Sequence, residues 1–341
     1  MSAYLTDILN QSAALCDTLI GLGDIPAVRP FAARLVSGAL RRVVLTGMGA
    51  SYHALHPICL SLMARGFMAQ MLETSELVHH APGLLEPRTL VVAVSQSGRS
   101  VETLLLLERI RGRGAMIAVT NTADSPLATQ ADAVVLTHAG PENTVSCKTY
   151  VSTLAALAVL GDALTGQDAA RTRIELQSAP DAFAGYLADW ETHVETLRQR
   201  LADVQQLIIT GRGPSLAAVG TASLIIKEAA HFPAEGMSSA AFRHGPLEMI
   251  SPEIFVLVYA GSEPTTDLNA RLVADVLAAG GRAALVRESL EPDAFALPPS
   301  PDSLRPLLEI LPAQMLSLAL AQLRRHEAGR FTRASKVTTI E

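Results

Sequence analysis

The sequence predicts an α/β protein that contains two copies of one parallel-sheet domain. Three observations lead to this fold class. Short apolar runs alternate with longer helical stretches, a motif recurs at a constant spacing, and hydrophobic residues make up 49% of the 341 residues while aromatic residues make up only 4%. A chain of this length usually holds about two domains. The composition excludes a disordered chain, and small aliphatic side chains suit close packing of helices on a sheet.

The repeat relates residues 42–55 to residues 206–219. Gly47 corresponds to Gly211 and Ser51 to Ser215, at a constant offset of 164 positions (211 − 47 and 215 − 51). The same offset holds downstream for two valines at positions 94 and 258. A register that persists over about 50 residues predicts two copies of one domain.

The apolar runs predict strands. In the first copy they cover residues 43–46, 90–95, 116–120 and 133–137, and in the second copy residues 207–210, 254–259 and 283–286. Near-continuous Val, Ile, Leu and Ala is typical of strands covered on both faces. Residues 100–111 and 215–232 are predicted helices. Alternating strands and helices imply parallel sheets with right-handed crossovers.

The segments outside the two copies complete the predicted organisation. We expect an N-terminal helical segment in residues 1–30, with its helix over residues 3–22. The first domain then covers residues 31–167, a helical connector residues 168–200, the second domain residues 201–328 and a polar tail residues 329–341. The connector should break near Pro180.

Charge and composition exclude several classes of protein. The chain has 27 basic and 33 acidic residues and no long basic run, which argues against a nucleic-acid partner. The apolar stretch 151–164 is shorter than the ~18 residues of a membrane span, and the N-terminus lacks the basic start of a secretory signal. Cys16, Cys59 and Cys147 are far apart and form no C-x-x-C, so we expect small buried hydrophobic residues, no disulfide and a cytoplasmic protein.

A glycine-rich turn follows the first predicted strand of each copy. Gly47 and Gly49 match the first two glycines of the dinucleotide motif G-x-G-x-x-G, but Tyr52 takes the place of the third. An acid about 20 residues further on, which that motif requires, is available in Glu73. Because both copies carry the turn, we favour a structural feature of the fold over a nicotinamide site.

The sharpest signal in the first copy is a polar turn between a predicted strand and a predicted helix. Ser95, Gln96, Ser97 and Ser100 gather there, and Gly98 permits the bend. Hydroxyl groups and free backbone N–H groups at a helix N-terminus suit a phosphate or similar anion. An ordinary serine N-cap is the alternative, although four polar side chains in six residues exceed the needs of one cap.

The second copy has diverged at this turn. Tyr259 and Gly261 replace Ser95 and Ser97, and Glu263 adds a charge that repels phosphate. Elsewhere this copy offers Glu228 in a helix and His244 in a later turn. A carboxylate and an imidazole are the usual pair for proton transfer near neutral pH. A solvated carboxylate and a capping or buried histidine remain open as alternatives.

Taken together, these segments resemble the SIS (sugar isomerase) family, and above all the isomerase half of the glutamine–fructose-6-phosphate aminotransferases. The similarity rests on the turn at residues 47–54, the Ser-Gln-Ser-Gly loop at 95–98, Lys-Glu at 227–228 and His-Gly-Pro at 244–246, with a lysine five residues before the end. It covers nearly the whole chain. It implies two tandem SIS domains, each a flavodoxin-like, three-layer αβα sandwich with a parallel sheet.

The resemblance also implies residue roles. The phosphate-binding residues would be Ser51, Ser95, Gln96, Ser97 and Ser100, and the sugar-binding residues Gly49, Ala50, Val145 and Ser146. Glu228 would carry a proton between C1 and C2, and His244 would assist ring opening, often from the neighbouring subunit. Lys336 would contact the open-chain sugar and could form a Schiff base. A homodimer with shared active sites is implied.

Three departures from the family pattern stand out. Ala50 occupies a position where the family often has Thr, the segment between Glu142 and Lys148 is one residue short, and the tail lacks the usual Asp-x-Pro-Arg motif. The chain also starts Met-Ser-Ala, without room for the glutaminase domain of those aminotransferases.

We therefore expect an isomerising glucosamine-6-phosphate deaminase that yields fructose-6-phosphate and ammonia. The alternatives are another phosphosugar aldose–ketose isomerase, a sugar-phosphate deglycase and a non-catalytic sugar-phosphate sensor. We expect no cofactor and no metal, because the histidine pairs at positions 53 and 56 and at 79 and 80 have no ligand cluster around them.

Overall fold

A computed structural model describes residues 1–333, 335–338 and 340 of the chain. These residues form two compact units, each built on its own sheet. The first-sheet unit comprises Ala13–Glu142, Lys148–Gln177 and the described residues from Arg333 onward, and the second-sheet unit comprises Met1–Ser12, Asn143–Cys147 and Ser178–Thr332. The domain boundaries expected above divide the chain more finely and stay a prediction.

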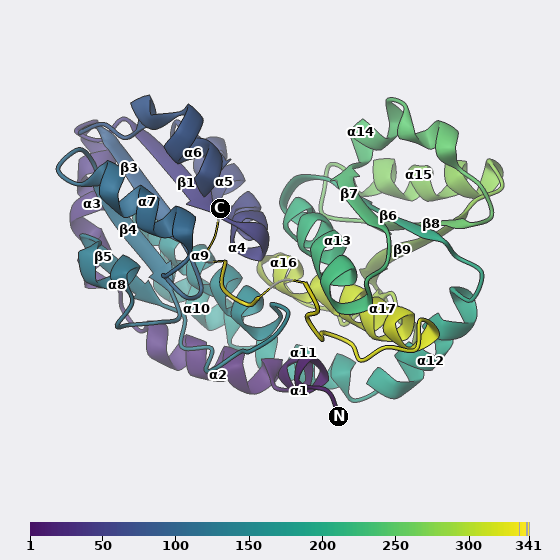
Figure 1. Cartoon of the computed structure of the whole chain (residues 1–341). Coiled ribbons are helices and arrows are strands. Elements are labelled where there is room, and N and C mark those ends of the chain that lie inside the picture. The colour runs from purple at the N-terminus through teal and green to yellow at the C-terminus, as the bar shows by residue number, and fades with distance from the viewer. Residues whose placement is uncertain (334, 339, 341) are drawn as a thin grey trace. The chain divides into compact units, whose positions relative to one another are not determined.

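The first sheet has five parallel strands in the order β2-β1-β3-β4-β5 (Figure 1). The strands are β1 (Arg42–Gly47), β2 (Ala69–Glu73), β3 (Thr89–Val94), β4 (Ala115–Thr120) and β5 (Ala133–Leu136). The helices that connect them are α4 (Gly49–His53), α5 (Leu55–Ala64), α6 (Thr74–His80), α7 (Val101–Ile110) and α8 (Pro126–Gln130). Parallel neighbours need such crossovers, and each one here passes through a helix.

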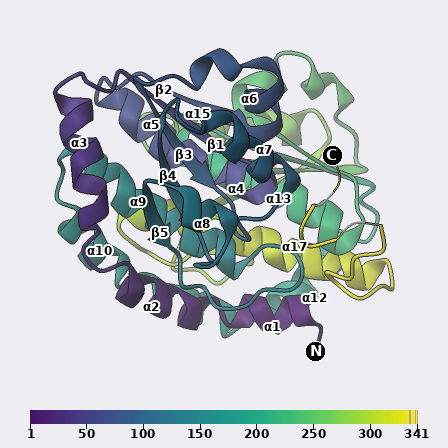
Figure 2. The same cartoon turned by 60° about the vertical axis from the view of Figure 1, so that its left-hand side comes forward.

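The remaining helices of this unit surround α9 (Lys148–Thr165). They are α2 (Gln11–Leu22), α3 (Arg29–Val36) and α10 (Ala169–Leu176), and α9 packs against α3, α5 and α10 (Figure 2). The length of α9 and its almost complete burial make it a central core helix of the unit.

The second sheet repeats this plan. Its parallel strands have the order β10-β9-β8-β6-β7, which is the order of the first sheet when strands are counted from the start of each copy. The strands are β6 (Gln206–Gly211), β7 (Ala234–Ser238), β8 (Ile254–Tyr259), β9 (Arg282–Glu288) and β10 (Ala296–Leu297). The equal strand order supports the 164-residue repeat as a repeat of structure.

The helices of the second-sheet unit come from both ends of the chain and from the connector. They are α1 (Ala3–Leu9), α11 (Ala179–Leu187), α12 (Trp190–Arg200), α13 (Leu216–Ala230), α14 (Ser239–Arg243), α15 (Thr266–Ala278), α16 (Arg305–Leu308) and α17 (Ile310–Leu323). Short 3₁₀ turns occur at Pro26–Val28, Pro82–Leu84, Gly213–Ser215, Pro246–Met249 and Asp302–Leu304. Helix α17 packs against both α12 and α13.

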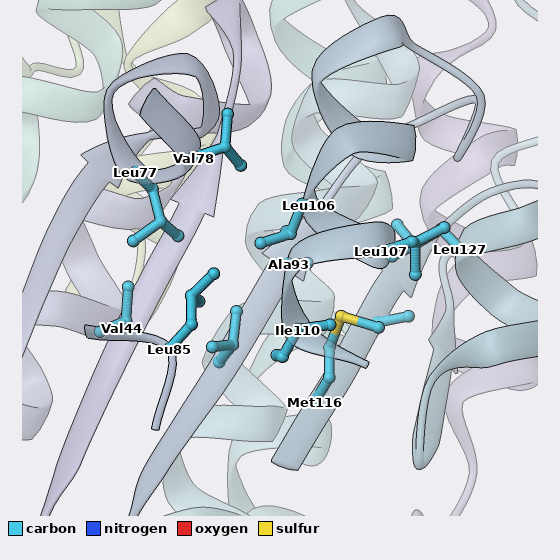
Figure 3. Close-up of a cluster of buried hydrophobic side chains, with 12 residues drawn as sticks. Val44, Leu77, Val78, Leu85, Ala93, Leu106, Leu107, Ile110, Met116 and Leu127 are labelled. Carbon is cyan, nitrogen blue, oxygen red and sulfur yellow. The ribbon is translucent and has the colours of Figure 1, made fainter. Parts of the chain in front are cut away.

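Aliphatic side chains fill the space between each sheet and its helices. Figure 3 shows one such cluster in the first-sheet unit, where strands β1, β3 and β4 meet α6, α7 and α8. Its labelled members are Val44, Leu77, Val78, Leu85, Ala93, Leu106, Leu107, Ile110, Met116 and Leu127. In the second-sheet unit, Ile208, Val256 and Val258 meet α14 and α15 in the same way. Burial at about 25 cal/mol per Å² of apolar area is the main stabilising contribution of such clusters.

The structure confirms the α/β class, the parallel sheets and the seven predicted strands, with small shifts at their ends. Other expectations need correction. The predicted helix over residues 3–22 is two helices, because α1 ends at Leu9 and α2 begins at Gln11. The connector breaks near Pro180 as predicted, between α10 and α11, and it breaks once more before α12. Cys59 and Cys147 are buried as expected, but Cys16 is exposed.

One helical stretch among the described residues, Asp302–Leu323, is long and apolar enough to cross a bilayer by length and composition. In the most apolar window of this stretch, 83% of the residues are buried inside the fold. Buried core helices meet the same criteria, so this stretch gives no support to a membrane span.

Candidate functional site

The polar turn predicted from the sequence lies at the carboxyl edge of the first sheet. It connects β3 to α7, and β3 pairs with β1, whose last residue Gly47 lies opposite Val94. The turn after β1 leads into α4, which carries Ser51 along with Gly49 and Ala50. The two turns are therefore adjacent, at the edge where open α/β sheets bind ligands.

Hydrogen bonds from the end of β4 and the segment that follows it fix the backbone of the polar turn. The carbonyl oxygen of Gln96 accepts hydrogen bonds from the hydroxyl groups of Thr120 and Thr122, both at 3.2 Å, and from the N–H of Asn121 at 3.1 Å. Gly98 has φ +61°, and a Cβ at this position would lie 2.3 Å from Oγ of Ser125. This turn therefore requires glycine at position 98 and has a fixed shape.

The side chains of the turn are arranged to donate hydrogen bonds. The hydroxyl oxygen of Ser95 accepts from the N–H of Gly98 at 3.1 Å, and that of Ser97 accepts from the N–H of Arg99 at 3.2 Å. Each of these hydroxyl groups keeps its own proton to donate, and the side-chain amide of Gln96 makes no hydrogen bond within the described part of the chain. Such convergent donors suit an oxyanion.

Ser100 precedes the first residue of α7. It is the N-cap of that helix, but its hydroxyl lies 2.8 Å from Oγ1 of Thr103 and caps no backbone N–H. This differs from the ordinary serine cap that the sequence left open as the alternative. The first N–H of the helix, that of Val101, donates instead to the carbonyl oxygen of Thr338, at 3.1 Å.

The tail therefore contacts the first-sheet unit, where Lys336 also forms an ion pair. Its Nζ lies 2.7 Å from Oε2 of Glu142, whose side chain is fully buried. Glu142 accepts two further hydrogen bonds from Thr149, from the N–H at 3.1 Å and from Oγ1 at 2.5 Å. Sequence reasoning did not single out Glu142. The sequence feature that could have indicated Glu142 is an acidic residue a few positions before a strongly apolar helix, α9. The tail prediction also covers residues 334, 339 and 341, which lie outside the described residues.

The predicted proton-transfer residues belong to the second-sheet unit. Glu228 is half-buried in the last turn of α13, and His244 is exposed at the end of α14. Both helices pack against β7, the edge strand of this sheet. Val145 and Ser146 group with the same unit, and Val145 is buried. The structure therefore divides the predicted site residues between the two units.

Helix α4 carries a ring where the dinucleotide motif requires a third glycine. Tyr52 makes edge-to-face contacts with His53 and His56, at centroid distances of 5.6 and 6.3 Å. Burial raises the pKa of Tyr52, with a smaller contribution from the charge of Glu73, and burial lowers the pKa of His56. A large neutral ring here disfavours the close approach of backbone and pyrophosphate on which dinucleotide binding depends.

Comparison with known proteins points to one family. Residues 39–162 match the family model of the SIS domain. The chain is 28% identical over 349 residues to the glutamine–fructose-6-phosphate aminotransferase (isomerizing) of Pyrococcus horikoshii. That match covers 99% of this chain and 57% of the relative, so the chain spans little more than half the length of the curated relatives it matches.

Solved structures share the fold. The C-terminal domain of glucosamine-fructose-6-phosphate aminotransferase from Francisella tularensis superposes with a TM-score of 0.84 at 20% identity, covering 97% of this chain and 98% of that one. Glucosamine-6-phosphate deaminase from Thermotoga maritima superposes with a TM-score of 0.78 at 19% identity, covering 99% of this chain and all of that one (100%). At these identities the likeness supports the fold.

Proposed function

From the match of residues 39–162 to the SIS domain, we propose that this chain is a member of the SIS family and an enzyme that isomerises amino sugar phosphates. The observation that carries the proposal is the fixed turn between β3 and α7, where the hydroxyl groups of Ser95 and Ser97 and the side-chain amide of Gln96 keep protons that they can donate. A sugar phosphate presents the oxyanion that such donors bind. The strand order of both sheets is the flavodoxin-like order, which supports two tandem SIS domains of three layers.

In this proposal each predicted residue has one role. The residues that hold the phosphate are Ser51, Ser95, Gln96, Ser97 and Ser100, and those that line the sugar are Gly49, Ala50, Val145 and Ser146. Glu228 is the base that moves the proton, and His244 assists ring opening. Lys336 contacts the open-chain sugar and could form a Schiff base with it.

We propose glucosamine-6-phosphate as the substrate and fructose-6-phosphate and ammonia as the products. Glu228 removes the proton at C2 of the open-chain aldehyde and returns a proton to C1, which leaves an imine at C2. Water then hydrolyses this imine, so the oxygen of the new ketone comes from water and the nitrogen leaves as ammonia. Deamination needs only water as the second reactant. The Thermotoga maritima protein named above is a glucosamine-6-phosphate deaminase, and the name of the Pyrococcus horikoshii relative gives fructose-6-phosphate as its sugar phosphate.

The decisive experiment assays ammonia and fructose-6-phosphate from purified protein and glucosamine-6-phosphate. We expect equal amounts of both products. Replacing Glu228 by Gln should lower kcat by about 10²–10⁴-fold, because the general base is lost, and should leave KM within a few-fold. Glu235→Gln is the matched control, since Glu235 is an exposed carboxylate of the same unit. This control should retain full activity.

The other outcomes separate the alternatives. If the sugar phosphate raises the melting temperature but no ammonia is released, the deaminase is wrong, and other aldose and ketose phosphates or amino-acid-linked sugar phosphates become the substrates to assay. Binding without turnover of any of them would favour a sensor. Loss of both turnover and binding in a folded Glu228→Gln variant would contradict the role of Glu228 as a base. We place the protein in the cytoplasm and propose a homodimer; Cys16, Cys59 and Cys147 form no disulfide with one another, which suits a reducing compartment.

A further inference from the structure

A buried acid that no proposed step uses lies in the second-sheet unit. Glu309 directly precedes α17, and 1% of its surface is exposed. Its Oε1 accepts a hydrogen bond of 2.7 Å from the hydroxyl group of Ser215, which is itself 2% exposed. By the 164-residue repeat, Ser215 corresponds to Ser51, a predicted phosphate ligand of the first-sheet unit. The acid therefore lies where the first copy would hold an anion.

The turn after β8 closes around the same place. Gly261, the counterpart of Ser97, has φ +68°. A Cβ on Gly261 would lie 3.3 Å from Oγ of Ser215 and 3.8 Å from Nδ2 of Asn269. Arg305 donates a hydrogen bond of 2.8 Å to the carbonyl oxygen of Gly261, which places a guanidinium group beside the turn. A hydroxyl, an amide and a cation thus surround one small region.

Two buried oxygen atoms of this cluster lack hydrogen-bond partners among the residues described. They are Oε2 of Glu309 and Oδ1 of Asn269. Asn269 is fully buried, and its Nδ2 donates to the carbonyl oxygen of Ala260 at 3.0 Å. Unpaired buried acceptors cost about 1–3 kcal/mol each and are rare in native proteins, so this cluster is not explained by stability alone.

The side chains around Glu309 favour its ionised form, whereas burial disfavours that form. Burial raises the pKa of Glu309 to about 7, whereas the hydroxyl of Ser215 and the guanidinium of Arg305 both act to lower it. The groups that face the carboxyl group therefore stabilise an anion, and removal from water opposes it.

We propose that the second-sheet unit retains an oxyanion pocket equivalent to that of the first-sheet unit, and that the carboxyl group of Glu309 occupies it as an internal ligand. Shortening this side chain opens the pocket to a free tetrahedral oxyanion such as inorganic phosphate. The internal ligand explains why the turn after β8 could lose its serines. In this unit the turn no longer binds a free anion, and Ser215 instead ties the start of α17 to the loop after β6.

The test measures the shift in melting temperature caused by inorganic phosphate, relative to sodium chloride of equal ionic strength. The shift of the wild-type melting temperature measures any phosphate binding at the first-sheet turn. The amount by which the shift of Glu309→Ala exceeds the wild-type shift measures binding in the new pocket. For a millimolar dissociation constant, about 10 mM phosphate should shift Glu309→Ala by about 4 °C more than the wild type. This excess does not depend on the proposed function, because the wild type carries the first-sheet turn unchanged.

Two matched variants locate the effect. Glu309→Gln fills the pocket without a charge and should show no excess shift. Combining Glu309→Ala with Ser215→Ala removes the donor and should reduce the excess to within about 1 °C of zero. An excess of the same size in either variant would overturn the proposal, as would a folded Glu309→Ala protein that responds to phosphate no more than the wild type. If Glu309→Ala folds only with phosphate present, the proposal is supported; if it stays unfolded with phosphate, the proposal is wrong.

Discussion

Two buried carboxyl groups show how the surroundings of a single residue set its chemistry. Glu142 accepts two hydrogen bonds from Thr149 and forms an ion pair with Lys336 at 2.7 Å. Glu309 receives one hydrogen bond, from Ser215, and its second oxygen has no partner among the described residues. A buried charge is stable when it is paired and hydrogen-bonded, and Glu309 lacks such a partner for one of its two oxygen atoms within the described residues.

The first prediction concerns Glu309 and the pH dependence of stability. Its pKa is raised from the ordinary value of 4.5 to about 7 by burial, against the opposing effects of Ser215 and Arg305. The folded state therefore holds the proton more tightly than the unfolded state. Its contribution to stability is fully present below pH 4.5 and is lost as the pH rises to 7. The difference between these two pKa values corresponds to about 3 kcal/mol.

Replacing Glu309 by Gln should remove this dependence. From pH 5 to pH 8, we expect the free energy of unfolding of the wild type to fall by up to about 3 kcal/mol more than that of the variant. Urea titrations at both pH values measure the difference. Glu327→Gln, at an exposed position, is the control and should behave as the wild type. Parallel pH profiles for wild type and Glu309→Gln would show that Glu309 is ionised at pH 5.

At the scale of elements, the position of Glu228 depends on the contact between α13 and β7. A Cβ on Gly236 of β7 would lie 2.7 Å from the carbonyl oxygen of Val219 and 2.9 Å from Oγ of Ser223, both on α13. Gly236→Ala must therefore push the strand and the helix apart. We expect it to destabilise the unit by about 1–3 kcal/mol and to lower kcat through the displaced Glu228.

A glycine in open space gives the matched control. A Cβ on Gly185, within α11, would meet nothing within 4 Å. Gly185→Ala should raise the free energy of unfolding by up to about 1 kcal/mol, because alanine is the better helix former, with kcat unchanged. Urea unfolding and steady-state kinetics test both variants. A neutral Gly236→Ala would mean that β7 and α13 tolerate a wider separation.

Among its described residues, the C-terminal tail contacts the first-sheet unit through the ion pair of Lys336 with Glu142 and the hydrogen bond from the N–H of Val101 to the carbonyl oxygen of Thr338. Glu142→Gln keeps the shape of the side chain and removes its charge. Loss of about 1–2 kcal/mol from this contact should speed tryptic cleavage after the exposed Arg333 by about 5–30-fold.

A surface ion pair supplies the comparison for the tail. Glu86→Gln breaks the contact of Glu86 with Arg42, a pair in which both side chains are partly exposed. It should leave the rate of cleavage after Arg333 unchanged, because such pairs contribute at most about 1 kcal/mol and this one does not involve the tail. Equal cleavage rates for wild type and Glu142→Gln would mean that the ion pair does not hold the tail in solution.

The elements that the sequence predicted correctly are those with a strong local pattern. Strands β3 and β8 are buried at every position, so their apolar runs are continuous. Strand β7 lies at a sheet edge, exposes Glu235 and Gly236, and carries no apolar run, so sequence patterning missed it. Strand β2 is at the other sheet's edge and was missed for the same reason. The edge strand β5 was predicted because all its residues are apolar, so β2 and β7 were missed for want of an apolar run and not through their edge position alone.

The predicted site shows the same limit. Ser95 and Ser97 could be placed because strand, turn and helix follow each other in the chain. Glu142 could not, because its partner Lys336 lies 194 residues away. The pair of Ser215 and Glu309 is separated by 94 residues. Periodicity reports contacts within a few residues and says nothing of such distant ones.

At the scale of the whole molecule, the proposed homodimer with shared active sites leads to the last prediction. If His244 acts on the substrate bound to the partner subunit, Glu228→Gln and His244→Ala should each inactivate a homodimer. A heterodimer of the two variants pairs an intact Glu228 with an intact His244 at one of its two sites. Such a heterodimer, isolated by two different affinity tags, should recover about half of the wild-type activity, since a symmetric dimer has two equal sites. A heterodimer of Glu228→Gln with the double variant Glu228→Gln/His244→Ala has no intact Glu228 and should stay inactive. An inactive first heterodimer would mean that each chain uses its own His244, and a monomer by light scattering would rule out sharing altogether.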